Sequence, residues 1–302
     1  MTVNRTMVTS VIDLLASPMV LASALTLKAV RKLGVQGMPV SRRIFSRIGV
    51  FPIEDHYYEP LFNPAHLNEK FAEPRDLPAI DWNREGQLEF LKQLTFFSNE
   101  IPNLPNTSFS GADAEYWYCL LRFLKPRKII EVGSGNSTRM AIKALSKNQI
   151  PCSHICIEPY EQSWLESSGA TIIRKRLEDT DRTIFSQLQS GDILFIDSSH
   201  VIRPQGDVLT EILEILPLLA PGVVVHFHDI FSPRHYHYKW VAEEVRLWNE
   251  QYLLEAFLSH NCQWEILGAL NYLKHENSTA LKAVCPTLTA DQQPGSLYIR
   301  RR

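Results

Sequence analysis

The chain has 302 residues, of which 45% are apolar, enough to bury a sizeable core in one large domain or in one domain with an appendage. Its 31 lysine and arginine residues nearly balance 33 aspartate and glutamate residues, and the net charge of −2 argues against a nucleic-acid partner. Five cysteines without a Cys-x-x-Cys pair predict no disulfide framework and favour a reducing, cytoplasmic setting.

An apolar segment lies near the start of the sequence, over residues 8–32. Its length suits a membrane span or a signal segment, but Asp13 and Pro18 fall inside it and no clear cleavage site follows. We therefore predict a helical hairpin broken near Pro18, which packs on the main domain, on a partner subunit of a homo-oligomer or on a membrane surface. Membrane contact through residues 8–30 is the less favoured alternative, because a bilayer tolerates a central acid poorly.

The next part of the chain, residues 34–110, is rich in proline and aromatic residues, as in the stretch RIGVFPIEDHYYEPLFNP. It lacks a regular alternation of strands and helices. We predict that residues 1–110 form an N-terminal extension of helices and irregular segments, which covers one end of the main domain and its substrate. Residues 111–302 then form the main domain.

Short runs rich in valine and isoleucine follow residue 127 and alternate with stretches of helical character. The runs are nearly continuous in apolar residues, which is typical of parallel strands covered on both faces. This alternation predicts an α/β fold with a doubly wound, mostly parallel, Rossmann-like sheet of seven strands. The predicted strands are 128–133, 154–159, 170–175, 192–197, 222–229, 262–267 and 296–301, and the predicted helices are 138–145, 161–166, 205–216 and 238–257.

The first predicted strand runs into a glycine-containing turn, EVGSGNST, over residues 131–138. Gly133 and Gly135 let the backbone turn sharply and approach a ligand. A dinucleotide-binding loop would carry a third glycine where this chain has Thr138, which argues against nicotinamide and flavin dinucleotides. Acids at Glu131 and Glu158 suit a cationic nucleoside without phosphates, and a turn that binds no ligand is the alternative.

The stretches EVGSGNST and CIEP resemble the first two motifs of the class I S-adenosylmethionine-dependent methyltransferases, and the resemblance covers about residues 115–270. It implies S-adenosylmethionine as the cofactor. The family contacts adenine at the place where this chain has RLEDTD, after the third predicted strand. By this resemblance Glu131, Gly133, Ser134 and Gly135 surround the methionine end of the cofactor, Glu158 binds the ribose hydroxyls, and Leu177 and Glu178 form the adenine wall.

Acids and histidines gather after the fourth and fifth predicted strands, in FIDSSH and HFHDIF. Because neighbouring parallel strands end at the same edge, Asp197, His200, His226, His228 and Asp229 are candidates for one site. Strand alternation points His226 and His228 to the same side. Carboxylates and imidazoles together can hold magnesium, manganese, iron or zinc, whereas a capping aspartate and a core histidine are the simpler alternatives.

This arrangement is similar to the metal-dependent small-molecule O-methyltransferases, in which an acid and an acidic or amide pair bind a divalent metal. By this similarity Asp197 is the first acid, and His228 and Asp229 occupy the place of the pair, with His226 as a further candidate ligand. His228 departs from the pattern because it is neither an acid nor an amide. His200 lies where the catechol-type enzymes carry a basic lysine, so we predict His200 as a general base acting with Asp197.

The sequence therefore predicts an S-adenosylmethionine-dependent methyltransferase that acts on a hydroxyl or an amine of a small molecule, assisted by a divalent metal and a histidine base. Two alternatives belong to other classes. One is a metal-dependent hydrolase that uses the HFHD cluster. The other is a subunit that binds the cofactor without doing chemistry.

Overall fold

The computed structural model describes residues 5–34, 36–61, 63–104, 108–160 and 163–302, and of residues 5–8 only the backbone. The chain divides into two compact units, Met1–Asn68 (unit 1) and Glu69–Arg302 (unit 2). The sequence predicts a division at residue 110, between an extension that covers the substrate and a domain that binds the cofactor. This functional division stays a prediction. By compactness, residues 69–110 belong with the sheet.

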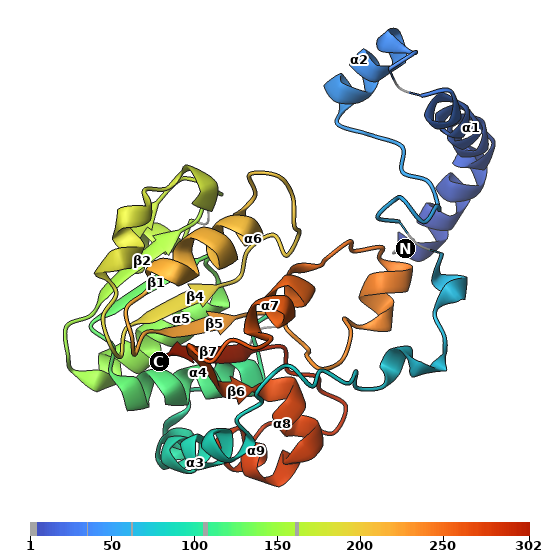
Figure 1. Ribbon diagram of the computed structural model, residues 1–302. Coiled ribbons are helices and arrows are strands. Elements are labelled where there is room, and N and C mark those ends of the chain that lie inside the picture. Colours follow the sequence, from blue (N-terminus) through green and yellow to red (C-terminus); the bar gives the residue numbers. More distant parts are fainter. Residues whose placement is uncertain (1–4, 35, 62, 105–107, 161–162) are drawn as a thin grey trace. The chain divides into compact units, whose positions relative to one another are not determined.

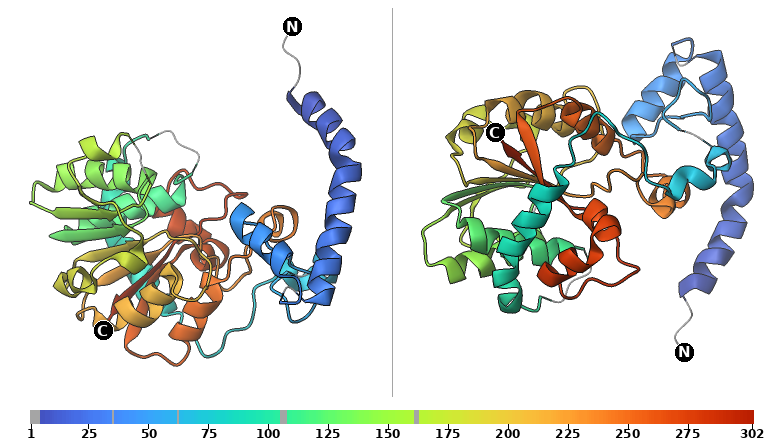
Figure 2. Two further views of the ribbon diagram at one scale, coloured as in Figure 1. Left: turned by 90° about the horizontal axis from the view of Figure 1, so that it is seen from above. Right: turned by 60° about the horizontal axis from the view of Figure 1, so that its bottom comes forward.

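Unit 1 contains two helices, α1 (Arg5–Leu33) and α2 (Pro39–Ile48), and the short turn η1 (Pro64–His66). The predicted break near Pro18 is wrong, because α1 continues through Pro18 over 29 residues (Figure 2). Good helix formers flank Pro18 on both sides, and they carry the helix past the one backbone hydrogen bond that proline removes. Helix α2 ends at Gly49, whose φ of 79° is the left-handed conformation that glycine adopts readily.

Unit 2 is built on the predicted seven-stranded sheet, whose strand order is β3-β2-β1-β4-β5-β7-β6 (Figure 1). The first five strands pair in parallel, whereas β7 pairs antiparallel with both β5 and β6. The sheet therefore confirms the predicted fold class. The strands are β1 (Lys128–Val132), β2 (Ser153–Ile157), β3 (Thr171–Ile173), β4 (Ile193–Ile196), β5 (Val224–Phe227), β6 (Trp264–Ala269) and β7 (Leu297–Arg301).

The central strands send alternate side chains into two separate cores, because side chains point to opposite faces with a period of two. Ile129 and Phe195 face one core, which α4 (Ala112–Leu124) and α5 (Asn136–Asn148) cover together with α3 (Arg84–Leu94), α8 (Leu270–Glu276) and α9 (Ser278–Val284). Ile130 and Ile196 face the other core, covered by α6 (Asp207–Leu209), η7 (Thr210–Ile215) and α7 (Glu250–Leu258). The remaining short turns are η2 (Glu69–Ala72), η3 (Thr95–Glu100), η4 (Leu165–Ser167), η5 (Leu177–Asp179), η6 (Arg182–Gln187), η8 (Leu216–Leu218) and η9 (Lys239–Glu243).

The predicted helices meet different outcomes. Residues 138–145 lie within α5, as predicted, and residues 205–216 contain α6 and the π-helical η7. The predicted helix at 161–166 begins at residues 161 and 162, which lie outside the described residues. A continuous helix over 238–257 is wrong, because the chain makes the short turn η9, leaves it through an irregular stretch, and starts α7 at Glu250. In that stretch the guanidinium carbon of Arg246 lies 4.5 Å from the ring centre of Trp240 and 4.6 Å from that of Trp248, so cation–π contacts help to hold the non-helical backbone.

Candidate active site

The glycine turn joins β1 to α5 at the carboxyl edge of the sheet. Gly133 has a φ of 79°, and a Cβ atom there would collide with the carbonyl oxygen of Asp197 at the end of β4. Only glycine therefore allows these two strand ends to approach so closely. At Gly135 an added Cβ would meet nothing within 4 Å, so the turn borders open space. The Gly135 N–H donates to Thr138 Oγ1 over 3.2 Å. Thr138, which stands where a dinucleotide-binding loop has its third glycine, therefore stabilises the turn through its side chain.

Two cavities adjoin the turn. The first, of about 340 Å³, is lined by Gly133, Glu158, Leu177 and Glu178 among others. The second, of about 380 Å³, is lined by Ser134, Gly135, Trp164 and His228 among others. Asp197 lines both cavities, so they meet beside the end of β4. Each cavity is large enough for part of a cofactor.

Glu158 holds the end of β2 against the glycine turn. Its carboxylate is largely buried and accepts the N–H of Ser134 over 3.2 Å and that of Tyr160 over 2.9 Å. Each carboxylate oxygen keeps a further lone pair that can accept a hydroxyl hydrogen from a ligand in the first cavity. The structure thus brings the predicted cofactor residues of the second and third strands to one cavity with the glycine turn.

Glu131 is the exception among the predicted cofactor residues. Glu131 lies two positions after Ile129, so its side chain points to the same face of the sheet, under α5, where it is fully buried. It lines neither of the two cavities. Its Oε1 lies 3.5 Å from His154 Nε2, and its Oε2 accepts the hydroxyl of Thr138. Burial acts to lower the pKa of His154, but the Glu131 charge outweighs it and raises the pKa to about 10. Glu131 therefore supports the turn through Thr138 and lies next to a cationic histidine.

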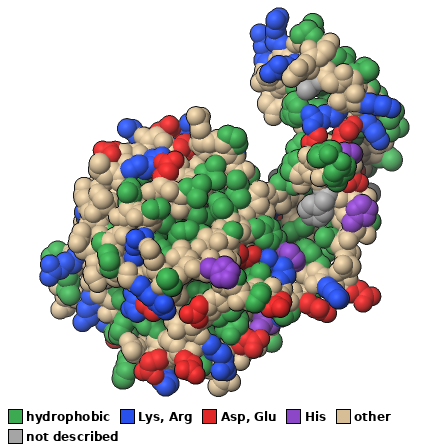
Figure 3. All heavy atoms as spheres, in the orientation of Figure 1, with side chains coloured by type: hydrophobic (Ala, Val, Ile, Leu, Met, Phe, Trp, Pro, Cys, Tyr) green, Lys and Arg blue, Asp and Glu red, His purple; other side chains and the backbone are tan. Residues whose placement is uncertain are grey.

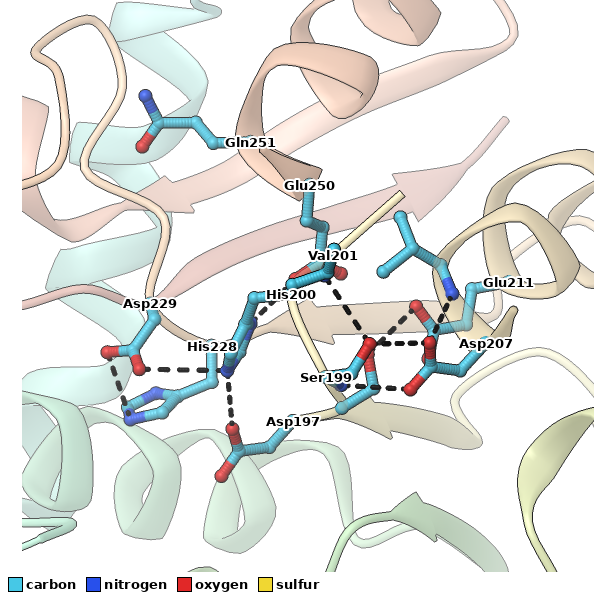
Figure 4. A network of polar contacts seen from close by, with 12 residues as sticks. Asp197, Ser199, His200, Val201, Asp207, Glu211, His228, Asp229, Glu250 and Gln251 are labelled. Carbon is cyan, nitrogen blue, oxygen red and sulfur yellow. Dashed lines mark hydrogen bonds and ion pairs between the residues drawn. The ribbon is translucent and has the colours of Figure 1, made fainter. Parts of the chain in front are cut away.

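Four of the five predicted acids and histidines lie together at the edge of the sheet, namely Asp197, His200, His228 and Asp229 (Figure 4). His200 Nε2 lies 3.3 Å from Asp197 Oδ1 and 3.8 Å from Asp229 Oδ2, while Nδ1 lies 2.8 Å from Glu250 Oε2. Ligand atoms of Asp197, His200 and Asp229 all lie within 4.8 Å of one another. We call these three residues the Asp-His-Asp group. It differs from the predicted metal set, because His200 and not His228 completes it.

A second group of this kind among the described residues consists of Glu131, His154 and Cys156. All three residues are buried under α5. The hydrogen bonds of this group run to the glycine turn, which makes it part of the support of that turn.

The backbone around His200 is held by distant parts of the chain. His200 and Asp229 have φ values of 59° and 57°, in the left-handed region that residues other than glycine seldom adopt. The His200 carbonyl accepts the N–H groups of Asn249 and Glu250 over 2.9 Å and 3.2 Å at the start of α7. Asp207 accepts the backbone N–H of Ser199 over 2.9 Å. Sequence analysis missed Glu250 and Asp207, since Glu250 lies 50 positions beyond His200 and no local pattern marks either residue.

The charges of the group reinforce one another. Burial acts to lower the pKa of His200, but hydrogen bonds to Asp197 and Glu250 outweigh it, so the pKa lies well above its usual value. Burial acts to raise the pKa of Asp197, yet the hydrogen bond from His200 and the nearby His228 bring it below its usual value. Without a metal, His200 is therefore a cation between carboxylates. A divalent cation offers the same charge complementarity, and two carboxylates with one imidazole suit manganese, iron or zinc as well as magnesium.

The other two histidines have different surroundings. His226 is fully buried in the core beside Phe195 and Tyr298, and its Nε2 lies 3.0 Å from Ser296 Oγ. Burial and the charge of His228 lower the pKa of His226 well below its usual value, so it is a neutral core residue and not one of the Asp-His-Asp group. The rings of His226 and His228 lie 5.7 Å apart on the same side of β5, as alternation predicts.

His228 connects the second cavity to a third one of about 190 Å³. Its Nε2 lies 3.7 Å from Asp229 Oδ1, and Asp229 also lines the third cavity. Burial acts to lower the pKa of His228, but Asp197, Asp229 and Asp113 outweigh it and raise the pKa. The lining of the third cavity combines polar and aromatic groups, which include Ser110, Asp113, Gln292 and Gln293 with Phe231, His237 and Trp240.

Comparisons with known proteins add evidence that is independent of this geometry. Residues 130–230 match the family model for a methyltransferase domain. An uncharacterized protein of Archaeoglobus fulgidus is 26% identical over 169 residues, which are 48% of this chain and 76% of that protein.

Solved structures with some likeness include SAH-bound methyltransferase PaMTH1 of Podospora anserina, with 16% identity and a TM-score of 0.40 over 71% of this chain and 88% of that one. Another is the O-methyltransferase TomG of Streptomyces achromogenes in complex with SAM. It is 14% identical, with a TM-score of 0.40, over 79% of this chain and 96% of that one. At such scores these likenesses say nothing about the acceptor of this chain.

Proposed function

We propose that the chain, whose residues 130–230 match a methyltransferase domain, is an S-adenosylmethionine-dependent methyltransferase that methylates a hydroxyl group of a small molecule with the help of a divalent metal. One observation carries the proposal. The Asp-His-Asp group lies where the cofactor cavities and the third cavity meet, since Asp197 lines the first two and Asp229 the third.

The first two cavities suit the cofactor by their volumes and by the polar groups that line them. The open space beside Gly135 and Ser134 takes the methionine end, and the free lone pairs of Glu158 accept the ribose hydroxyls. Leu177 and Glu178 line the part of the first cavity left for adenine. S-adenosylmethionine supplies a methyl group activated on a sulfonium sulfur.

The Asp-His-Asp group is the proposed metal site, and its donors fit a divalent cation. Glu250 lies 2.8 Å from His200 Nδ1, which leaves Nε2 as the atom that faces Asp197 and Asp229. A carboxylate behind a ligating histidine is the usual means of fixing the orientation of that ring. When bound, the metal would orient the acceptor oxygen and lower the pKa of its hydroxyl.

We assign the proton transfer to His228 instead of His200. In this proposal His200 Nε2 binds the metal together with Asp197 and Asp229, and Nδ1 faces Glu250 Oε2 at 2.8 Å, so neither ring nitrogen is left to take a proton from the acceptor. His228 lines both the second and the third cavity. Its Nε2, beside Asp229, is positioned to take the proton of an acceptor hydroxyl. Replacing His200 should therefore weaken metal binding, whereas replacing His228 should leave metal binding intact and abolish proton transfer.

The third cavity favours a small, polar acceptor that contains a ring. Trp240 and Phe231 offer flat apolar surfaces, whereas Asp113 and Gln292 offer groups that hydrogen-bond to hydroxyls. We propose a single ring with neighbouring hydroxyl groups as the acceptor class. The alternative of a metal-dependent hydrolase has less support, because His226 of the HFHD cluster lies in the core.

Calorimetry with S-adenosylmethionine and S-adenosylhomocysteine tests the cofactor part. The wild type should bind both compounds, and Gly135→Trp, which fills the open space, should bind neither while it unfolds at the same temperature. Absence of binding to the wild type would rule out the assigned cavities.

Metal analysis and an acceptor screen that detects homocysteine formation test the rest. Asp197→Ala should lose Mn²⁺ binding and turnover, whereas His228→Gln should keep Mn²⁺ binding and lose turnover. Cofactor binding without turnover on any hydroxylated ring would favour the non-catalytic subunit. Turnover that needs no divalent ion would remove the metal from the proposal.

A further inference from the structure

Unit 1 exposes a long apolar stretch of helix α1, whose contacts with the rest of the unit include those of Arg31 with Phe51 and Glu59 near its carboxyl-terminal end. Among the described residues, one helical stretch, Thr9–Leu33, is long and apolar enough to cross a membrane, and none of its most apolar window is buried. Leu14, Leu15 and Met19 each expose about three quarters of their surface, at 74%, 75% and 76%. An apolar surface of this extent indicates an interaction site.

Helix α2 has the composition of a helix that lies in a membrane interface. Three of its apolar residues recur every four positions and are exposed, Phe45 is half-buried, and its charged residues are all basic. Apolar residues spaced in this way form one stripe along the helix, and the arginines occupy the remaining faces. The exposed apolar residues are Val40, Ile44 and Ile48, and the basic residues are Arg42, Arg43 and Arg47.

The charges of α1 and α2 are distributed unevenly. Arg5 begins α1, Asp13 is the sole acid from there to Gly49, and no further base precedes Lys28, whereas six bases lie from Lys28 to Arg47. Thr9–Leu27 would extend over about 28 Å as a helix, close to the roughly 30 Å of a hydrocarbon core, with Asp13 within about one turn of the distal interface. Hydrophobic and basic side chains are both visible over these helices in Figure 3. The six bases are Lys28, Arg31, Lys32, Arg42, Arg43 and Arg47.

From this distribution we infer that unit 1 anchors the enzyme to an anionic lipid bilayer, with α1 inserted in the hydrocarbon core and α2 lying among the headgroups. A bilayer satisfies both features, because hydrocarbon accepts the surface of α1 and anionic headgroups accept the arginines of α2. A second copy of the chain would cover the apolar surface but would bring like charges together. The bases on the carboxyl-terminal side of α1 place unit 2 on the cytoplasmic side.

Flotation of the full chain with lipid vesicles tests this inference. Wild-type protein should float with vesicles of phosphatidylcholine and phosphatidylglycerol and should resist extraction by alkaline carbonate. Leu21→Arg, in the middle of α1, should leave the protein in the soluble fraction. Phe96→Arg replaces an equally apolar and 84% exposed residue of unit 2 and should float like the wild type. S-adenosylmethionine binding should be unchanged in both variants, which shows that unit 2 is folded.

A comparison of anionic with neutral vesicles tests the basic residues of α2 separately. Three arginines near an anionic surface should give a roughly 100-fold preference for vesicles with phosphatidylglycerol over pure phosphatidylcholine at low salt. The triple variant Arg42→Glu, Arg43→Glu and Arg47→Glu should lose this preference, whereas Lys143→Glu with Lys147→Glu, on exposed positions of α5, should keep it. Wild-type protein that stays soluble beside both kinds of vesicle, or that forms a soluble dimer abolished by Leu21→Arg, would overturn the inference.

Discussion

The buried pair of His154 and Glu131 makes a sharp prediction about the glycine turn. Replacing His154 with leucine removes the cation 3.5 Å from the Glu131 carboxylate and leaves that carboxylate fully buried. The carboxylate also accepts the hydroxyl of Thr138, which in turn accepts the Gly135 N–H. His154→Leu should therefore destabilise unit 2 and also disturb the turn that borders the second cavity.

Two estimates give the magnitude of the destabilisation. Removing one partner of a buried ion pair costs about 3–5 kcal/mol. A histidine whose pKa rises from 6.5 to about 10 on folding contributes about 4 kcal/mol at pH 7, where the unfolded residue is largely neutral. We expect a loss of about 4 kcal/mol in the free energy of unfolding of His154→Leu at pH 7.

Urea unfolding, followed by tryptophan fluorescence, measures this loss. The double variant His154→Leu with Glu131→Gln should recover part of it, because the unpaired buried charge is gone. His275→Leu, at an exposed histidine of unit 2, serves as the matched control and should change little. A loss below about 1 kcal/mol in His154→Leu, or a double variant no more stable than the single one, would refute an ion pair at this position.

Further predictions concern pH, the two glycines and the proposed metal site. Because the folded pKa of His154 is raised, its contribution is complete below pH 6.5 and declines as the pH rises to about 10, so wild type and His154→Leu should converge in stability over that range. Gly133→Ala should destabilise unit 2 by more than about 1 kcal/mol, whereas Gly135→Ala should unfold like the wild type but bind S-adenosylmethionine more weakly, as urea unfolding and calorimetry would show. Glu250→Gln should lower Mn²⁺ affinity by about 10- to 100-fold, and an unchanged affinity would argue against His200 as a ligand.

Local patterns in the sequence were enough to predict the sheet. Each strand is a short run of valine, isoleucine and similar residues, and burial of both faces requires just such a run wherever the chain enters a parallel sheet. The sequence also predicted the turn at Gly133, because the close approach of the backbone to Asp197 leaves no room for a side chain and requires glycine. The edge position of Asp197, His200 and Asp229 followed from the rule that parallel strands end together.

Long-range packing decided what those patterns left open. The partner of His200 is Glu250, which α7 brings to it from 50 positions away. Strand parity and the helices above it place Glu131 and His226 in the core, although both stand in motifs that suggest a ligand. A sequence therefore determines where a strand ends and which residues follow it. Which of those side chains share a charge, a hydrogen bond or a cavity depends on distances between distant segments, and these exist only once the chain has packed.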